Sequence, residues 1–168
     1  MERACHARYP RSMAELDRID AELLHHLQLD ARLTAQDLAE RVNLSPSQCA
    51  RRRQRLEEAG MIRSYRAVVN AAKVGATVEA FIQVVMAAHN RENARDFVAR
   101  MQVTAEVVAV WTLTGSTDYL LRVFCADLPA LNRLVQDVLL PHPAVARVQS
   151  QIVMERLKDN APVSVHPG

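Results

Sequence analysis

Four arginines within five consecutive positions are the strongest chemical signal in this chain: Arg51, Arg52, Arg53 and Arg55. Guanidinium groups form paired hydrogen bonds with phosphate oxygens and with the edge of guanine, so such a run is typical of DNA recognition. Ser45 and Pro46 precede the run, and they suit the N-cap and the first position of a helix. The pattern predicts a short, positively charged helix that a DNA major groove can accept.

These side chains cannot all face one duplex, because they project from different sides of a helix. Those nearest the helix start are expected to contact bases or phosphates: Ser47, Gln48, Arg51 and Arg52. Arg53 or Arg55 is expected to pair with Glu57 or Glu58, or to contact a flanking phosphate. The alternative is an ordinary solvated helix face, which the Ser-Pro cap disfavours. The full set of candidate DNA-binding residues is Thr34, Ser45, Ser47, Gln48, Arg51, Arg52, Arg53 and Arg55.

Composition supports a local basic surface more than a global one. The net charge of the 168-residue chain is only +2, whereas the segment from Pro46 to Arg66 holds six arginines and two glutamates. Three cysteines, an odd number, argue against a disulfide framework and for the reducing cytoplasm. No apolar run reaches the roughly 18 residues of a membrane helix, and Met1 to Ser12 lacks the apolar region of a secretory signal. We therefore expect a cytoplasmic protein without a membrane partner.

The first half of the chain has the pattern of a helix-turn-helix domain. Apolar residues recur at helical spacing from Leu16 to Leu27, and Thr34 then caps a second short helix. Asn43-Leu44 makes the tight turn into the arginine-rich helix, which Gly60 ends. Met61 to Val69 alternates loosely and is expected to be a strand. Three helices followed by a strand predict a winged helix-turn-helix.

The second half predicts an α+β domain of the ferredoxin-like βαββαβ type. Strands are expected over residues 78–88, 106–114, 117–124 and 145–157, and helices over 90–101 and 127–139. Gly115-Ser116 marks a hairpin, and Leu128 belongs to the apolar stripe of the last helix. The expected domains are a disordered extension (1–13, with Met13 as an alternative translation start), the DNA-binding domain (14–66), a linker (67–77), the ferredoxin-like domain (78–158) and a tail (159–168).

One face of the predicted sheet lacks a cover. In the βαββαβ order both helices cover the same face of the sheet, yet the strand from Val107 to Trp111 is apolar on both sides. A sheet with two apolar faces must bury both. Pairing with a second copy across a two-fold axis is the economical solution, and a dimer can present two helices to half-sites about one helical turn apart.

Motifs in both halves resemble the Lrp/AsnC (leucine-responsive, feast/famine) family of transcription regulators. The resemblance covers about Leu16 to Lys158, and its motifs follow one another in the family's order. They are Leu16-Asp17-Arg18-Ile19-Asp20, Leu44-Ser45-Pro46 with Cys49 and Arg51-Arg52-Arg53, Leu56-Glu57 with Gly60-Met61-Ile62, Gly115 to Leu121, and Val153-Met154-Glu155. The family implies an N-terminal DNA-reading domain, a C-terminal domain that senses amino acids, and dimers that commonly associate into octamers.

The resemblance also implies an effector site between dimers, around the hairpin loop. The positions that it assigns to this site are Gly115, Ser116, Thr117, Asp118, Tyr119, Leu128, Gln151, Ile152 and Val153. Asp118 can pair with the ammonium of an amino acid, and turn amides near Gly115 can bind its carboxylate. The alternative is an ordinary hairpin turn. Many relatives carry aspartate where this chain has Ser116, which puts the effector's identity in question.

No catalytic or metal-binding constellation is apparent. Cys49 lies on the inward stripe of its helix as a small apolar residue, and the adjacent His25-His26 has no metal-ligand spacing. We therefore expect no cofactor and no enzyme activity. The leading hypothesis is a regulator whose DNA affinity or assembly responds to an amino acid. The alternative is an effector-independent protein of the same family that bends or wraps DNA.

Overall fold

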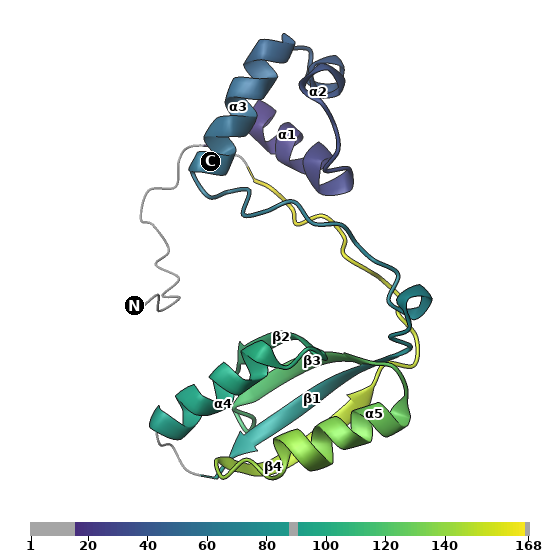
Figure 1. The fold of residues 1–168 in the computed structure, drawn as a ribbon. Helices are drawn as coiled ribbons and strands as arrows, with labels where there is room; N and C mark the ends of the chain where they lie inside the picture. Colours follow the sequence, from purple (N-terminus) through teal and green to yellow (C-terminus); the bar gives the residue numbers. More distant parts are fainter. Residues whose placement is uncertain (1–15, 88–90, 167–168) are drawn as a thin grey trace. The chain divides into compact units, whose positions relative to one another are not determined.

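The computed structural model describes residues 16–87 and 91–166 (Figure 1). The chain forms two compact units, one made of residues up to Ala67 together with the segment from Lys158, the other of Val68–Leu157. The chain therefore passes from the first unit into the second and returns. The expected disordered extension, residues 1–13, lies outside the described residues.

Three helices form the first unit, as the apolar spacing predicted. They are α1 (Arg18–Leu29), α2 (Ala35–Val42) and α3 (Pro46–Glu58). Thr34 and Ser45 are the N-caps of α2 and α3, each in a reciprocal capping box, so both cap predictions are confirmed. Asn43, between these helices, adopts a left-handed φ of 55°, and Gly60 follows α3 with a φ of 71°.

The three helices enclose a small apolar core. Leu23, Leu38, Cys49 and Leu56 are among its most deeply buried side chains, and they come from all three helices. Burial raises the pKa of the Cys49 thiol, because a thiolate would lose its hydration there. The inward position predicted for Cys49 is thus confirmed, and its thiol is held in the neutral form.

The predicted strand from Met61 to Val69 is wrong. The N–H groups of Met61 and Ile62 bond to the carbonyl of Leu56 and turn the chain back along α3. The residues that follow are extended, but no described segment of this chain forms a ladder with them. Alternating apolar residues favour a strand only where a partner strand is available, and this segment has none within the chain.

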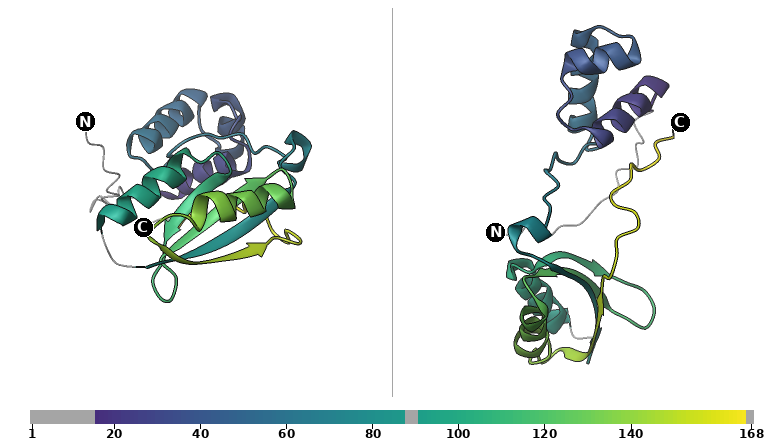
Figure 2. Two further views of the ribbon diagram at one scale, coloured as in Figure 1. Left: turned by 60° about the horizontal axis from the view of Figure 1, so that its bottom comes forward. Right: turned by 90° about the vertical axis from the view of Figure 1, so that its right-hand side faces the viewer.

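The second unit has the βαββαβ order that the sequence predicts. Its strands are β1 (Val78–Met86), β2 (Val107–Thr112), β3 (Tyr119–Cys125) and β4 (Val145–Ile152), in the antiparallel order β2-β3-β1-β4. The helices are α4 (Arg91–Val103) and α5 (Leu128–Arg133), which continues into a π-helical turn (Leu134–Leu139). A short 3₁₀ turn (Ala72–Val74) precedes β1. Both helices cover one face of the sheet (Figure 2).

The end of β4 and the burial of Leu128 differ from the predictions. β4 ends at Ile152 and not at Leu157, because in the described backbone beyond it only the Val153 N–H still bonds to the backbone of β1, at Glu79. Leu128 is 55% exposed and lies outside the buried stripe. Leu128 is the first residue of α5, directly after the Asp127 N-cap. The buried residues of this helix begin only at Leu131.

The sheet face away from the helices is partly apolar and open. Trp111 lies opposite Leu120, and Phe81 opposite Arg122, so these four side chains share that face. Trp111 is 44% exposed. On the other side of β2, Val107 and Val110 pack against the core. The prediction that β2 is apolar on both sides is confirmed.

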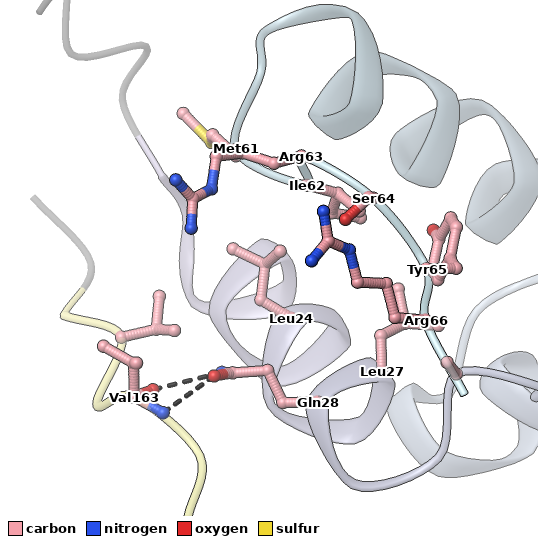
Figure 3. A pocket seen from close by; sticks show the side chains of 12 residues that line it. Leu24, Leu27, Gln28, Met61, Ile62, Arg63, Ser64, Tyr65, Arg66 and Val163 are labelled. Carbon is pink, nitrogen blue, oxygen red and sulfur yellow. Dashed lines mark hydrogen bonds between the residues drawn. The ribbon is translucent and has the colours of Figure 1, made fainter. Parts of the chain in front are cut away.

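The C-terminal segment packs against α1 within the first unit. The side-chain amide of Gln28 forms two hydrogen bonds with the backbone of Val163, at 3.1 Å to its carbonyl and 2.7 Å from its N–H (Figure 3). Val165 packs against the apolar core. A groove of about 540 Å³ remains between this segment, α1 and the chain from Met61 to Arg66.

Candidate nucleic-acid interface and small-molecule site

The start of α3 is held rigidly by its own side chains. The hydroxyl of Ser45 accepts the N–H of Gln48 at 3.3 Å, and the amide oxygen of Gln48 accepts the N–H of Ser45 at 3.1 Å. Pro46 occupies the first helical position, where no N–H is needed. Because Gln48 uses only its oxygen in the cap, its NH₂ group is available to donate to a ligand.

Arg51 is the arginine of this helix that is exposed and without an internal partner. Within the described residues its side chain forms no ion pair or hydrogen bond. It lies one turn after Ser47 and Gln48, which are also exposed, so the three share one side of the helix. Ser47 forms a bond of 3.1 Å to the hydroxyl of Ser45.

Arg52 and Arg55 point instead toward α1. One terminal nitrogen of Arg52 lies 2.6 Å from Asp17 and 2.9 Å from Asp20, and the Arg52 side chain is only 24% exposed. Arg55 pairs with the second oxygen of Asp20, whose side chain is fully buried. The hydrogen bonds that Arg52 donates to these two aspartates, the one to Asp17 first, raise the pKa of Arg52. Both guanidinium groups therefore join α3 to α1.

Arg53 is held on the opposite flank of the helix. Its guanidinium bonds to Glu57 at 3.1 Å, to the hydroxyl of Tyr65 at 2.9 Å and to the carbonyl of Leu33 at 3.1 Å. It also stacks over the Tyr65 ring at 4.7 Å. The hydroxyl of Tyr65, and then Arg53, lower the pKa of Glu57. Of the expected pairings of Arg53 or Arg55 with Glu57 or Glu58, the one between Arg53 and Glu57 is confirmed, whereas Arg55 pairs with Asp20.

Thr34 lies away from α3, at the start of α2. Its hydroxyl donates to Asp37 at 2.7 Å, and the Asp37 N–H donates back to it at 3.2 Å. Its exposure leaves it open to a phosphate, but its established task is the cap.

Sequence reasoning missed the aspartates that bind these arginines. Asp17 and Asp20 lie one turn apart on α1, as Arg52 and Arg55 do on α3, so the two pairs have matching spacing. That matching i, i+3 spacing was the available signal. Without the angle between the helices it did not identify partners more than 30 positions apart.

The second candidate site begins at the hairpin between β2 and β3. The loop is closed by the N–H of Leu113 bonding to the carbonyl of Asp118 at 2.9 Å, and Gly115 has a φ of 106°, which favours glycine. Ser116 is exposed. The carboxylate of Asp118 accepts the N–H of Met86 at 2.8 Å, so one of its oxygens already serves the fold.

The two residues that flank Asp118 point into the fold. Thr117 is buried and its hydroxyl lies 3.3 Å from the side-chain oxygen of Gln83. The Tyr119 ring lies 5.2 Å from that of Phe97 in the helix-covered core. Burial raises the pKa of Tyr119. Of the predicted effector residues in this hairpin, Gly115 and Ser116 are exposed, and Asp118 keeps one oxygen for which no hydrogen bond is found within the described residues.

The other positions of the effector site lie elsewhere on the sheet. Ile152 pairs with Ala80, whereas the hairpin end of β3, Tyr119, pairs with Val84. Four residues of β1 separate these points, or about 13 Å at roughly 3.3 Å per residue. Leu128 follows the opposite end of β3. Within one chain the structure does not bring Leu128 or Gln151–Val153 to the hairpin.

Neither a metal centre nor a membrane segment is found in the part of the chain that the structure describes. No group of three side chains from His, Cys, Asp and Glu there is arranged to hold a metal ion. No described helix combines the length and apolar character needed to cross a bilayer. The arrangement instead offers an exposed, capped helix start in one unit and a polar hairpin in the other.

Comparison with known proteins assigns each unit to a family of domains. The model described as Winged helix-turn-helix DNA-binding matches residues 16–63, and the Lrp/AsnC ligand binding domain matches residues 79–163. The leucine-responsive regulatory protein of Rhizobium meliloti (strain 1021) is 36% identical over 151 residues, which cover 90% of this chain and 97% of that protein.

Solved structures show the same likeness over both units. A transcriptional regulator of Neisseria meningitidis in complex with L-Met is 39% identical, with a TM-score of 0.85 over 88% of this chain and 96% of that one. An AsnC family transcriptional regulator from Agrobacterium tumefaciens is 34% identical, with a TM-score of 0.78 over 84% and 92%.

Proposed function

The chain belongs to the Lrp/AsnC family of transcriptional regulators, and we propose that it reads DNA through the exposed start of α3. The observation that carries this proposal is the free guanidinium of Arg51 beside the exposed Ser47 and Gln48. The first turn of a helix that leads into the major groove is the part that reaches base edges. Arg51 suits guanine, and the free NH₂ of Gln48 suits an acceptor on a base or phosphate.

Replacing Arg51 by Gln tests this assignment. We expect the loss of one guanine contact to cost roughly 1–3 kcal/mol at one operator position. If Arg51 contacts phosphate as well, the slope of log K against log salt falls by about 0.9. Binding of a labelled duplex across a salt series measures both quantities. Arg100→Gln, at an exposed arginine of α4, is the control with the same charge change. Equal binding by the Arg51→Gln variant and the wild type would contradict the assignment.

The second unit binds a small effector, and we propose that this effector is an α-amino acid held at the hairpin. The proposed contacts are the free oxygen of Asp118 for the ammonium, and amides near Gly115 with the Ser116 hydroxyl for the carboxylate. A relative that was crystallised with L-Met supports this ligand class. Because Leu128 and Gln151–Val153 lie away from the hairpin, we propose that they complete the site from neighbouring copies.

A thermal-shift screen of the twenty amino acids tests the effector. We expect at least one L-amino acid to raise Tm and to change DNA affinity, because it binds one state better than another. Asp118→Asn is the sharp variant, since an asparagine oxygen can still accept the Met86 N–H while the charge is lost. We expect it to weaken the response at least tenfold. An undiminished response in Asp118→Asn would limit Asp118 to its role in the turn.

One observation favours the second candidate, effector-independent DNA bending or wrapping. The carboxylate of Asp118 is already bonded to Met86, and the neighbouring Ser116 is neutral. If no amino acid changes Tm or DNA affinity while the duplex is still bound, this candidate replaces the first.

We further propose that the protein is a homodimer that assembles to an octamer and acts in the cytoplasm, on the nucleoid. The open, partly apolar sheet face with Trp111 supports pairing of two copies.

The named relatives are regulators, and we propose that this chain likewise acts without catalysis or a cofactor.

A further inference from the structure

We propose that Asp20 is a positioning residue for DNA reading, which holds Arg52 and Arg55 away from the duplex and fixes the angle of α3. This inference rests on the proposed role of α3. Two of the four arginines then contribute to specificity and not to the attraction of DNA phosphates. Arg51 contacts the bases, whereas Arg52 and Arg55 orient the helix that carries Arg51.

Both carboxylate oxygens of Asp20 are bonded to arginines of α3. One oxygen accepts Arg52 at 2.9 Å and the other accepts Arg55, while the carboxylate itself is fully buried. One oxygen of Asp17 also accepts a hydrogen bond from Arg52, at 2.6 Å. The other oxygen of Asp17 caps α1 by accepting the Asp20 N–H at 2.8 Å. A guanidinium that satisfies a buried carboxylate cannot leave it without exposing an unpaired charge in the core.

The arrangement links the two helices at two points on each. Asp17 is the N-cap of α1 and Asp20 lies in its first turn, whereas Arg52 and Arg55 lie three positions apart on α3. A single ion pair or an apolar contact permits α3 to rotate about its own axis. Two contact points on each helix restrict this rotation. Arg55 lies one turn after Arg51, so these ion pairs fix how the side of α3 that carries Gln48 and Arg51 is turned relative to α1.

The network also limits non-specific affinity. Each arginine that contacts phosphate adds to the sequence-independent part of DNA binding. Because Asp20 holds two guanidinium groups in ion pairs, it lowers the sequence-independent part of the DNA affinity and leaves the base contacts intact. Specificity, the ratio of operator to random-sequence affinity, is therefore higher than four free arginines would give.

Asp20→Asn in the full chain tests the proposal, because the amide keeps the shape but loses the charge that binds the arginines. Binding is measured on an operator duplex and on a random-sequence duplex of equal length across a salt series. We expect the salt slope on random DNA to steepen by about 0.9 for each arginine released. Affinity for random DNA should rise several-fold and the specificity ratio should fall. A merely structural role would lower both affinities without steepening the slope.

Glu22→Gln is the matched control. It removes one negative charge from the same helix, at the partner of the exposed Arg18, and touches no residue of α3. We expect no change of slope in this variant. If Asp20→Asn and Glu22→Gln steepen the slope equally, a general charge effect accounts for the result and the proposal is overturned. An unchanged slope in folded Asp20→Asn overturns it as well.

Arg55→Gln keeps the proposal testable if Asp20→Asn does not fold. Arg55 is 58% exposed, so its loss is tolerated more readily than that of Arg52. We expect Arg55→Gln to leave the salt slope unchanged. A loss of about 0.9 in Arg55→Gln would show a phosphate contact and overturn the proposal. Failure of the wild type to bind either duplex would instead contradict the proposed function itself.

Discussion

Asp17 has two structural tasks, and its charged carboxylate serves both. It caps α1 through the Asp20 N–H and pairs with Arg52. The hydrogen bond from the Asp20 backbone, more than the pairing with Arg52, holds the pKa of Asp17 below its usual value of 3.8. A lowered pKa in the folded state means that the stabilisation is complete above the unfolded pKa and is lost as the pH falls through the folded one.

We therefore expect the first unit to lose stability below about pH 4, partly through Asp17. Asp17→Asn should flatten this loss, because asparagine also caps a helix but does not titrate. Melting temperatures of the two proteins between pH 7 and pH 3 measure the effect. Parallel curves would show that protonation of Asp17 contributes nothing.

Single residues were predictable where their partners are near in sequence. Ser45 and Thr34 were identified as caps because a cap bonds to an N–H three positions ahead. Arg53 or Arg55 was expected to pair with Glu57 or Glu58, and Arg53 does pair with Glu57, its i+4 neighbour. The partners of Arg52 and Arg55 depend instead on how α1 crosses α3, which local spacing does not determine.

Among the elements, helices were predicted more accurately than the extended segments. Helical periodicity and caps are properties of one segment, so α1, α2 and α3 were located well. A strand depends on a partner, and the segment from Met61 to Val69 has none within the described chain. Val68 and Val69, which are neighbours in the sequence, are both exposed, so the alternation of residue types in this segment does not mark a buried strand face.

The C-terminal segment was assigned no partner from the sequence, yet it binds α1. Gln28 supplies two hydrogen bonds to Val163. At about 1 kcal/mol each, their loss in Gln28→Ala should lower the free energy of unfolding of the first unit by about 1–2 kcal/mol. Hydrogen exchange of the α1 amides measures this change. Gln36→Ala, whose amide contacts only Glu40 within the described residues, is the control and should change little. Equal exchange in the two variants would contradict the docking.

For the whole molecule, the βαββαβ order and the open sheet face followed from the pattern of apolar residues. The effector site did not follow in the same way. Positions that the family resemblance assigns to this site, around Gly115, Leu128 and Gln151, lie apart in one chain. A site built between copies depends on assembly geometry, which the periodicity of one chain does not encode.

Selection of duplexes from a random-sequence pool by the purified full chain tests the central claim most directly. If the start of α3 reads DNA in a two-fold dimer, the wild type should enrich an inverted repeat with half-sites about one helical turn apart. Arg51→Gln should lose preference at one base pair of each half-site. Enrichment of no sequence by the wild type, or of an identical motif by Arg51→Gln, would contradict the account.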